Sequence, residues 1–365
     1  MQKLVISEQD AGQRLDKFLA KYLRLAPKSF LYKMLRKKNI ELNGKKAEPG
    51  ALLCGGDTVS LWLSEETIAS FRGGLPGTYG AVSRNSGHEG QAGDRSAGRG
   101  LLRSGNEHKA GRAEKELLRT VSVIYEDEQI LIADKPAGLL SQKAAASDYS
   151  LNEYLLDRLQ AQSDIPAETH GFRPSVCNRL DRNTSGLVTF AKTYQAARFL
   201  TGLFADRGIH KYYLALVAGE MTEAERIEGW LRKQEAGNQV EVHSRPFAGA
   251  DRIETAYEPL RQLTFGRART AATLLRVLLV TGKTHQIRAH LQSLGHPILG
   301  DPKYGDRDLN RRLSAETGIN HQLLHAWELQ FPEKLPAAFS HLAGAGFRAP
   351  LPKCWACVLG QDMAV

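Results

Sequence analysis

The segment VCNRLDRNTSGL, residues 176–187, places charged and amide side chains directly before the apolar run LVTFA at 187–191. A short apolar run of this kind is typical of a buried strand. An aspartate at the edge of a core costs free energy unless a cation pairs with it, and pairing keeps a carboxylate ionised. Asp181 in this turn is therefore a candidate nucleophile or general base.

Two further polar segments adjoin apolar elements. Tyr212 and Tyr213 begin one apolar run, and GKTHQIR at 282–288 follows another. A tyrosine ring can stack on a flat nucleobase, and an arginine can pair with a carboxylate. The tripeptide containing Asp181 is, by itself, more typical of an ion pair that holds a turn. The three segments together favour a catalytic site that acts on a base.

Other motifs in this region are incomplete. The tripeptide GKT at 282–284 ends a phosphate-binding loop, but Val277 occupies the position of the required glycine. His285 and His290 are five residues apart, which is not the spacing of two metal ligands on one helix face. The sequence contains neither HExxH nor GxSxG. We therefore predict no nucleotide cradle, no metal site and no hydrolase elbow.

The elements that must position these segments are predicted from periodicity and turn signals. Two strands flank the acidic turn 126–128, and the remaining predictions are a helix at 150–159, a strand at 187–192, a helix at 195–207, strands at 210–219 and 270–280, and a helix that ends at Gly295. Strands and helices alternate without regular βαβ spacing. The pattern therefore predicts an α+β fold rather than a doubly wound sheet.

Residues 1–63 form a separate predicted unit with helices followed by short strands. This unit has twelve Lys and Arg residues against six Asp and Glu residues, a net charge of +6. A dense group of basic residues comprises Lys28, Lys33, Arg36, Lys37 and Lys38. Most such groups are solvated helix faces, but here they also suit RNA phosphates. Residues 64–116 contain eleven glycines and few large apolar side chains, which predicts a flexible linker before a second domain at 117–365.

The composition of the whole chain agrees with a polyanionic partner. The chain has 365 residues, a net charge of +9 and a pI of about 9.3. We expect no membrane span and no secretory signal, and hence a cytoplasmic location. The CWAC pair at 354–357 has no second cysteine pair at zinc-finger spacing, so we predict unpaired thiols.

The central segment VCNRLDRNTSGLVTFAKT resembles the HRLDxxTSGLL motif of the RluA, RluC and RluD type of RNA pseudouridine synthase. The resemblance continues in family order over about 120–335, through KPAG at 135–138, KYYLALVAG at 211–219, TGKTHQIRAHLQSLGHPILGDPKYG at 281–305 and LLHAWELQF at 323–331. Residues 12–63 resemble the RNA-binding module of ribosomal small-subunit protein four. This implies a catalytic domain built on a mixed, largely antiparallel sheet, preceded by a small α/β RNA-binding domain.

The resemblance also implies roles for individual residues. Asp181 matches the catalytic aspartate, Tyr213 the active-site tyrosine and Arg288 the arginine that pairs with the aspartate. Tyr212 is a competing match for the tyrosine. Asn178 stands where the family usually has histidine. The residues expected to contact RNA are Asn178, Arg179, Lys283, His285 and the basic residues Lys28, Lys33, Arg36, Lys37 and Lys38.

The implied activity is the isomerisation of uridine to pseudouridine in structured RNA, without metal or organic cofactor. Large-subunit rRNA and tRNA both remain possible targets, and we expect a monomer. The residues leave open whether Asp181 attacks the sugar or removes a proton from it. We also expect Arg179 to hold the turn or to contact phosphate. Two alternative functions remain open at this point: an RNA-binding or ribosome-assembly protein with an inactive domain, and a nucleoside hydrolase that would release free uracil.

Overall fold

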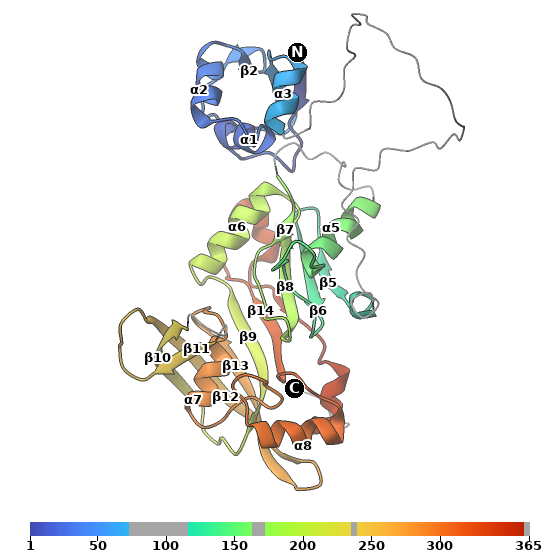
Figure 1. The fold of residues 1–365 in the computed structure, drawn as a ribbon, viewed down its shortest axis with the longest axis vertical. Coiled ribbons are helices and arrows are strands. Elements are labelled where there is room, and N and C mark those ends of the chain that lie inside the picture. Colours follow the sequence, from blue (N-terminus) through green and yellow to red (C-terminus); the bar gives the residue numbers. More distant parts are fainter. Residues whose placement is uncertain (73–115, 163–171, 235–238, 361–365) are drawn as a thin grey trace, which may run out of the picture. The chain divides into compact units, whose positions relative to one another are not determined.

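The computed structural model describes residues 1–72, 116–162, 172–234 and 239–360 (Figure 1). The chain divides into two compact units, one formed by residues up to Arg72 and one formed mainly by the residues from 116 onwards. Each unit has its own apolar core, and each is described by itself below.

The first unit is a four-stranded antiparallel sheet with three helices. The strands lie in the order β1, β4, β2, β3, with bounds Gln2–Val5, Thr58–Leu61, Ile40–Leu42 and Lys45–Lys46. The helices are α1 (Leu15–Tyr22), α2 (Lys28–Arg36) and α3 (Glu65–Arg72). Leu15, Phe18 and Leu19 of α1 are fully buried, because their spacing places them on one helix face. The small α/β fold predicted for this unit is therefore confirmed.

The predicted boundary at residue 63 is wrong, because α3 belongs to the first unit. Ile68 is buried in the core of this unit. The Phe71 ring lies 4.8 Å from the Phe30 ring, and the Phe71 carbonyl accepts a hydrogen bond from the Leu25 N–H. Packing of these two aromatic side chains stabilises a helix in a segment that the sequence assigned to the linker. The rest of the predicted linker, residues 73–115, lies outside the described residues.

The second unit is built on one large sheet. Its strands lie in the order β11, β10, β12, β13, β9, β14, β8, β6, β5, with β15 beside β14 and β7 beside β8. The bounds are β5 Ser122–Glu126, β6 Ile130–Lys135, β7 Ser175–Val176, β8 Ser185–Ala191, β9 His210–Ala218, β10 Glu225–Lys233, β11 Val240–His243, β12 Asp251–Phe265, β13 Thr270–Leu279, β14 Leu324–Gln330 and β15 Gly346–Arg348. β8 and β14 pair in parallel, and the other named pairs are antiparallel. This confirms the predicted mixed, largely antiparallel α+β fold.

Helices cover both faces of this sheet (Figure 1). They are α5 (Leu151–Ala161), α6 (Tyr194–Ala205), α7 (Gln286–Ser293), α8 (Arg307–Thr317) and α9 (Ala356–Leu359), with short 3-10 turns at Ala337–Leu342 and Lys353–Trp355. Side chains of β9 alternate between the two faces. Tyr213 and Val217 share a core with α5 and α7, whereas Leu214 and Leu216 share a core with α8 and α9. The face that carries Tyr213 is the one that forms the site.

The parallel contact between β8 and β14 explains the glycine in the central motif. Gly186 has φ +112°, and a Cβ atom there would lie 2.2 Å from the carbonyl oxygen of Ala326. Glycine is required here both by this backbone conformation and because the β14 backbone approaches too closely for any side chain. The close approach holds the end of the central motif against the middle of the sheet.

Candidate active site

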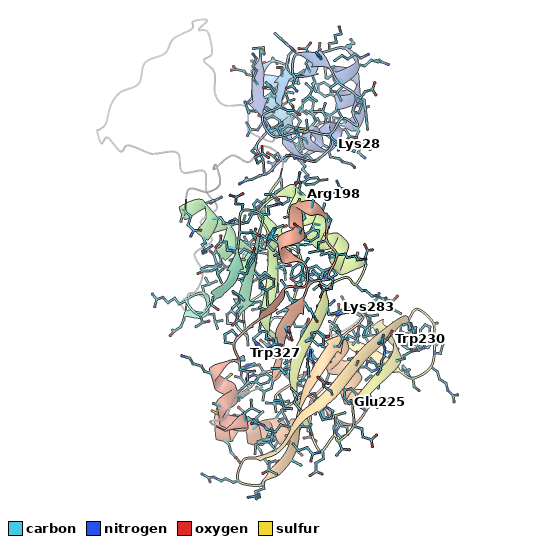
Figure 2. The ribbon with its side chains drawn as sticks, turned by 180° about the vertical axis from the view of Figure 1, so that it is seen from behind. Lys28, Arg198, Glu225, Trp230, Lys283 and Trp327 are labelled. Carbon is cyan, nitrogen blue, oxygen red and sulfur yellow. The ribbon has the colours of Figure 1, made fainter. Side chains whose placement is uncertain are left out.

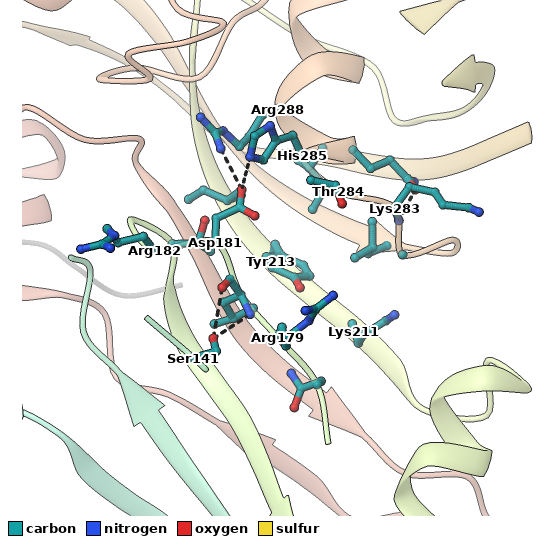
Figure 3. A pocket seen from close by; sticks show the side chains of 18 of the residues that line it. Ser141, Arg179, Asp181, Arg182, Lys211, Tyr213, Lys283, Thr284, His285 and Arg288 are labelled. Carbon is teal, nitrogen blue, oxygen red and sulfur yellow. Dashed lines mark hydrogen bonds and ion pairs between the residues drawn. The ribbon is translucent and has the colours of Figure 1, made fainter. Parts of the chain in front are cut away.

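Asp181 lies in the loop between β7 and β8, and its side chain is 27% exposed (Figure 3). The preceding residue, Leu180, is buried. The Ser141 hydroxyl donates to the Leu180 carbonyl over 3.1 Å and accepts from the Leu180 N–H over 3.0 Å. This pair of bonds fixes the backbone directly before the carboxylate, while the carboxylate itself reaches solvent.

Lys135 also binds this loop, from its buried side. Its side chain is fully buried, and Nζ donates to the carbonyls of Pro136, Leu139 and Arg182 over 3.0, 2.8 and 3.0 Å. Burial lowers the pKa of Lys135 to about 7, although the nearby negative charge of Asp181 acts to raise it. Three carbonyl acceptors use all three N–H groups of an ammonium. Lys135 therefore ties the segment after β6 to the loop that carries Asp181.

Arg288 pairs with Asp181, as the resemblance implies (Figure 3). Its Nη1 lies 2.8 Å from Asp181 Oδ2. On its other side, Nε and Nη2 bind the two oxygens of Asp301 over 2.7 and 2.9 Å. The Arg288 side chain is 4% exposed and Asp301 is fully buried, so water has little access to this bidentate ion pair. These two carboxylates and the fold of α7 orient the guanidinium toward the loop.

His285 lies beside the same carboxylate rather than at an exposed RNA-binding rim. It precedes α7 with a left-handed backbone, φ +54°, and its Nε2 lies 3.8 Å from Asp181 Oδ2. Its Nδ1 lies 3.0 Å from the Tyr304 hydroxyl, which accepts the Val240 N–H over 2.9 Å. Because the hydroxyl oxygen accepts this bond, its own hydrogen can be donated to Nδ1 of His285. We therefore assign the single N–H of the neutral imidazole to Nε2, which faces Asp181. Burial lowers the pKa of His285, which favours this neutral form.

The structure distinguishes the two neighbouring tyrosines. Tyr213 is buried and lines the cavity, and burial together with the charge of Asp181 raises the pKa of its phenol. Tyr212 points to the opposite face of the sheet, where the Arg276 guanidinium lies 4.0 Å from its ring centroid. Strand alternation therefore places Tyr213, and not Tyr212, in the site.

The cavity around Asp181 has a volume of about 950 Å³ and a basic rim. Arg179, Arg182 and Lys283 are exposed on this rim, and Lys211 is partly buried there (Figure 3). Burial lowers the pKa of Lys211. Lys283 pairs with Asp251 over 2.7 Å in an exposed ion pair, which an RNA phosphate can replace at little cost. The rim thus suits the RNA backbone.

Asn178 lines the cavity but directs its amide at β8. Its Oδ1 accepts the Thr189 N–H over 2.7 Å and the Thr189 hydroxyl over 2.9 Å, and its Nδ2 donates to the Leu187 carbonyl over 3.3 Å. The sequence assigned Asn178 to RNA contact. The side chain that replaces the usual histidine instead pins the central motif to its own strand.

The basic residues predicted on the first unit are all exposed. They lie on or just after α2: Lys28, Lys33, Arg36, Lys37 and Lys38. Figure 2 shows Lys28 on the surface of this unit. Leu31, Met34 and Leu35 of the same helix are buried, so the charges occupy its solvent face.

Sequence reasoning missed the residues that support Asp181 and Arg288. Ser141 lay in no recognised motif, and its role follows from contacts with a loop 39 residues away. Lys135, Asp301 and Tyr304 lie inside the segments KPAG and DPKYG, which were matched to the family without a role. The sequence features that could have pointed to these residues are a lysine at the end of a strand, Lys135, and an aspartate three residues before a tyrosine, Asp301 and Tyr304.

Neither a membrane-spanning helix nor a cluster of metal ligands occurs among the described residues. No helix in this part of the chain is long and apolar enough to cross a membrane. Within the same ranges, no group of three or more His, Cys, Asp or Glu side chains is arranged to hold a metal ion.

Comparisons with known proteins agree with the fold of both units. Residues 129–293 match the RNA pseudouridylate synthase model, and residues 13–59 match the S4 domain model. The chain is 30% identical to ribosomal large subunit pseudouridine synthase C of Escherichia coli K12 over 90% of this chain and 88% of that protein. The Vibrio cholerae enzyme of the same name is also 30% identical, over 91% and 89%.

A solved structure supports the fold alone. Human RNA pseudouridylate synthase domain containing 4 superposes with a TM-score of 0.51 at 22% identity, over 67% of this chain and 93% of that one. Three findings agree: the superposition with the solved structure, the match to the family model, and the 30% identity over most of both chains. The chain belongs to the RNA pseudouridylate synthase family and is a pseudouridine synthase, an isomerase with an N-terminal S4 RNA-binding domain.

Proposed function

We propose that this enzyme converts uridine to pseudouridine in large-subunit rRNA, with Asp181 acting on the sugar of a flipped-out uridine. The observation that carries the proposal is the Asp181 carboxylate itself. It is partly exposed in a basic-rimmed cavity, and Arg288 binds it on one side only. The target class is supported by the names of the relatives, which are ribosomal large-subunit enzymes. A tRNA target is the alternative that the experiment below distinguishes.

One carboxylate suffices for this chemistry. The reaction breaks the bond between C1′ and N1, rotates the uracil and joins C5 to C1′, so the base leaves as a stabilised anion and never departs from the pocket. A glycosidase, in contrast, needs a second carboxylate to activate water. Arg288 binds Oδ2 of Asp181, while Oδ1 has no partner among the described residues. Oδ1 is thus placed to attack C1′ or to remove the proton from C2′.

We assign Tyr213 a stacking role. The raised pKa of its phenol keeps it neutral at physiological pH, which disfavours a phenolate base at this position. A neutral ring on the cavity wall can hold the uracil by its flat face while the base turns. The proton on C5 is lost after the new carbon–carbon bond forms, and Tyr213 assists this step by positioning the base.

RNA capture is assigned to two sets of basic residues. The rim residues Arg179, Arg182 and Lys283 surround the cavity and suit the phosphates next to the flipped uridine. The α2 residues, including Lys33 and Arg36, form the electrostatic surface of the S4 domain. Contacts of this kind supply affinity, whereas the cavity supplies the chemistry.

The experiment is to map pseudouridines in total RNA from cells with and without the gene, and to restore the gene as wild type or as Asp181→Asn. We expect one or more large-subunit rRNA pseudouridines to disappear and to return only with the wild type. Loss confined to tRNA would show that the target is wrong. Normal restoration by Asp181→Asn would refute the assigned mechanism.

The purified enzyme distinguishes the two remaining alternatives. Incubation with a large-subunit rRNA transcript, followed by nucleoside chromatography, should show pseudouridine and no free uracil. Release of uracil would indicate a hydrolase. RNA binding without any conversion would indicate an RNA-binding protein with an inactive domain.

A further inference from the structure

Gln322 is a buried amide in the wall of the cavity, two residues before β14. The residue is 2% exposed and lines the cavity. Its Nε2 donates to the Thr184 hydroxyl over 3.1 Å. Its Oε1 has no hydrogen-bond partner anywhere in the described part of the chain. One end of this amide is therefore held in place, and the other end is unpaired.

An unpaired buried amide oxygen is unusual. Buried polar atoms in folded proteins nearly always have a partner, because an unsatisfied group loses its hydration without compensation. Among the described residues that have such an atom, Gln322 is the one that lines the cavity around Asp181, where a ligand could supply the missing bond.

The amide lies close to the catalytic turn. Thr184, which orients Gln322, donates its backbone N–H to the Asp181 carbonyl over 3.1 Å. Thr184 is itself buried and lines the same cavity. Gln322 is thus one hydrogen-bonded residue away from the turn that carries the nucleophile. Asp181, Thr184 and Gln322 therefore line one continuous cavity.

We propose that Gln322 is a specificity-determining residue that reads the polar edge of the uracil. Oε1 accepts the N3–H of uracil, which is the edge that distinguishes uracil from cytosine. Cytosine has an unprotonated N3 that would face the oxygen lone pairs. A phosphate is excluded as the partner, because an amide oxygen cannot donate to it, whereas the cationic rim can. This inference rests on the proposed function, since it assumes that uridine occupies the cavity.

The orientation by Thr184 supports this reading. A glutamine amide rotates freely unless one end is bound, and a site that rejects a competing base needs a donor or acceptor in a fixed position. With Nε2 bound to Thr184, Oε1 faces away from that bond. A buried acceptor left unpaired by the wrong base then disfavours cytidine, in the same way that hydrogen-bonding pockets reject analogues that lack the matching group.

The first test is Gln322→Met in the full chain. Methionine keeps the length of the side chain and removes both polar ends. The substrate is a synthetic RNA hairpin that carries the mapped uridine, and conversion is followed by nucleoside chromatography. We expect kcat/KM to fall about 10- to 100-fold, and RNA affinity to change less than about twofold, because phosphate contacts dominate it. Tm should change little, because the lost bond to Thr184 and the removal of an unpaired buried oxygen act in opposite directions.

The matched control is Thr184→Val, which removes the hydroxyl that orients Gln322 but retains the amide and its acceptor oxygen. If Gln322 only braced Thr184, both variants would lose the same activity and stability. That result would overturn the proposal, as would wild-type kcat/KM in Gln322→Met. A larger loss of activity in Gln322→Met than in Thr184→Val, without loss of Tm, supports it.

The second test changes the substrate. The hairpin is made with 3-methyluridine at the mapped position, so that N3–H is replaced by a methyl group. We expect the wild type to prefer uridine over 3-methyluridine by about 100-fold or more, and Gln322→Ala, which leaves room for the methyl group, to reduce this preference to a few-fold. An unchanged preference in Gln322→Ala would refute the assignment. Failure of the wild type to convert uridine in the same hairpin would instead refute the proposed function.

Discussion

Arg288 donates from Nη1 to Oδ2 of Asp181 over 2.8 Å, although the two residues are 107 positions apart in the chain. The guanidinium is shared with Asp301, which occupies Nε and Nη2 and is fully buried. The bidentate contact with Asp301 holds the guanidinium in one plane and directs Nη1 toward Asp181. The orientation of the group that pairs with Asp181 thus depends on an aspartate that does not line the cavity.

Asp301→Asn should lower kcat more than it raises KM. The amide offers one acceptor oxygen in place of two, so Arg288 loses part of the contact that orients it toward Asp181. We expect kcat to fall about 10- to 100-fold, which corresponds to the loss of one charge-assisted hydrogen bond. Asp308→Asn is the matched control, because its pair with Arg311 is exposed on α8 and contributes little. Equal activity in the two variants would contradict a positioning role for Asp301.

Tyr213→Leu should reduce turnover far more than Tyr213→Phe. The leucine removes the aromatic face and the phenylalanine removes only the hydroxyl. Stacking of a base on an aromatic ring contributes about 1–3 kcal/mol, so we expect a loss of about 10- to 100-fold for leucine and less than about 10-fold for phenylalanine. Tyr212→Leu tests the same substitution on the opposite face of the sheet, beside Arg276. An inactive Tyr213→Phe would show that the hydroxyl, and not the ring, is required.

Tyr304→Phe should impair catalysis through His285. The variant keeps the ring, which lies 5.2 Å from the Arg288 guanidinium carbon, but removes the hydroxyl that holds His285 Nδ1. The imidazole is then free to carry its proton on Nδ1 and to present a lone pair to Asp181. We expect kcat to fall about 3- to 10-fold, roughly the effect of one neutral hydrogen bond.

The pH profile distinguishes this role of Tyr304 from a purely structural one. The pKa of His285 in the wild type lies below 6.5, so its neutral form should persist and turnover should be level above that pH. Loss of the Tyr304 hydroxyl should change the acidic limb of the kcat profile. A fall in kcat with an unchanged profile would argue against the tautomer assignment.

Neutralising α2 should weaken RNA binding without changing the chemistry. The triple variant Lys33→Gln, Arg36→Gln, Lys37→Gln removes three exposed charges. If all three contact phosphates, the slope of log K against log salt should decrease by about 2–3, and kcat at saturating RNA should stay unchanged. The matched control removes three exposed arginines from α8, Arg307, Arg311 and Arg312, with the same change in net charge. An equal effect in the control would indicate a general charge effect and not an S4 binding face.

His325 should make the enzyme less stable at acidic pH. Burial lowers the pKa of this histidine to about 4, and its Nδ1 lies 2.8 Å from the Ser185 hydroxyl. Between pH 6.5 and about 4 the unfolded chain binds a proton that the native chain does not, so the free energy of unfolding falls as pH falls. His325→Gln should reduce this slope by about 1.4 kcal/mol per pH unit. Denaturant unfolding from pH 7 to 4 measures it, and an unchanged slope would show that His325 titrates alike in both states.

The sequence was sufficient to predict that Asp181 and Arg288 form a pair. The charged turn, considered together with the two other polar segments, drew attention to Asp181, and the family motif implied Arg288 as its partner, which the structure shows 2.8 Å away. Local periodicity also predicted most of the strands and helices that carry the site, such as β9 and α6, because these are set by interactions between residues close in the chain. The predicted strand at 210–219 and the predicted helix at 195–207 agree with the structure within two residues.

The choice between adjacent residues was decided by the sheet. Tyr212 and Tyr213 are the same residue type, so the sequence alone does not distinguish them. Successive side chains of a strand point to opposite faces of the sheet. The pairing of Tyr213 with Val277 and Ala326 determines which of the two tyrosines faces the cavity. Asn178 turned toward Thr189 for a similar reason, since β8 lies within reach of its amide. The helix α3 was missed because its stability depends on Phe30 and not on its own sequence.

The supporting contacts could be found only in the tertiary structure. Three hydrogen-bonded pairs illustrate this. Ser141 and Leu180 are 39 residues apart, Asp301 and Arg288 are 13 apart, and Gln322 and Thr184 are 138 apart. A polar side chain has no local signature for such a partner, because the hydrogen bond exists only once the sheet has brought two distant loops together. The sequence alone therefore determined the family and the candidate residues of the site, and the packing of distant segments decided how those residues are held and which of them line the cavity.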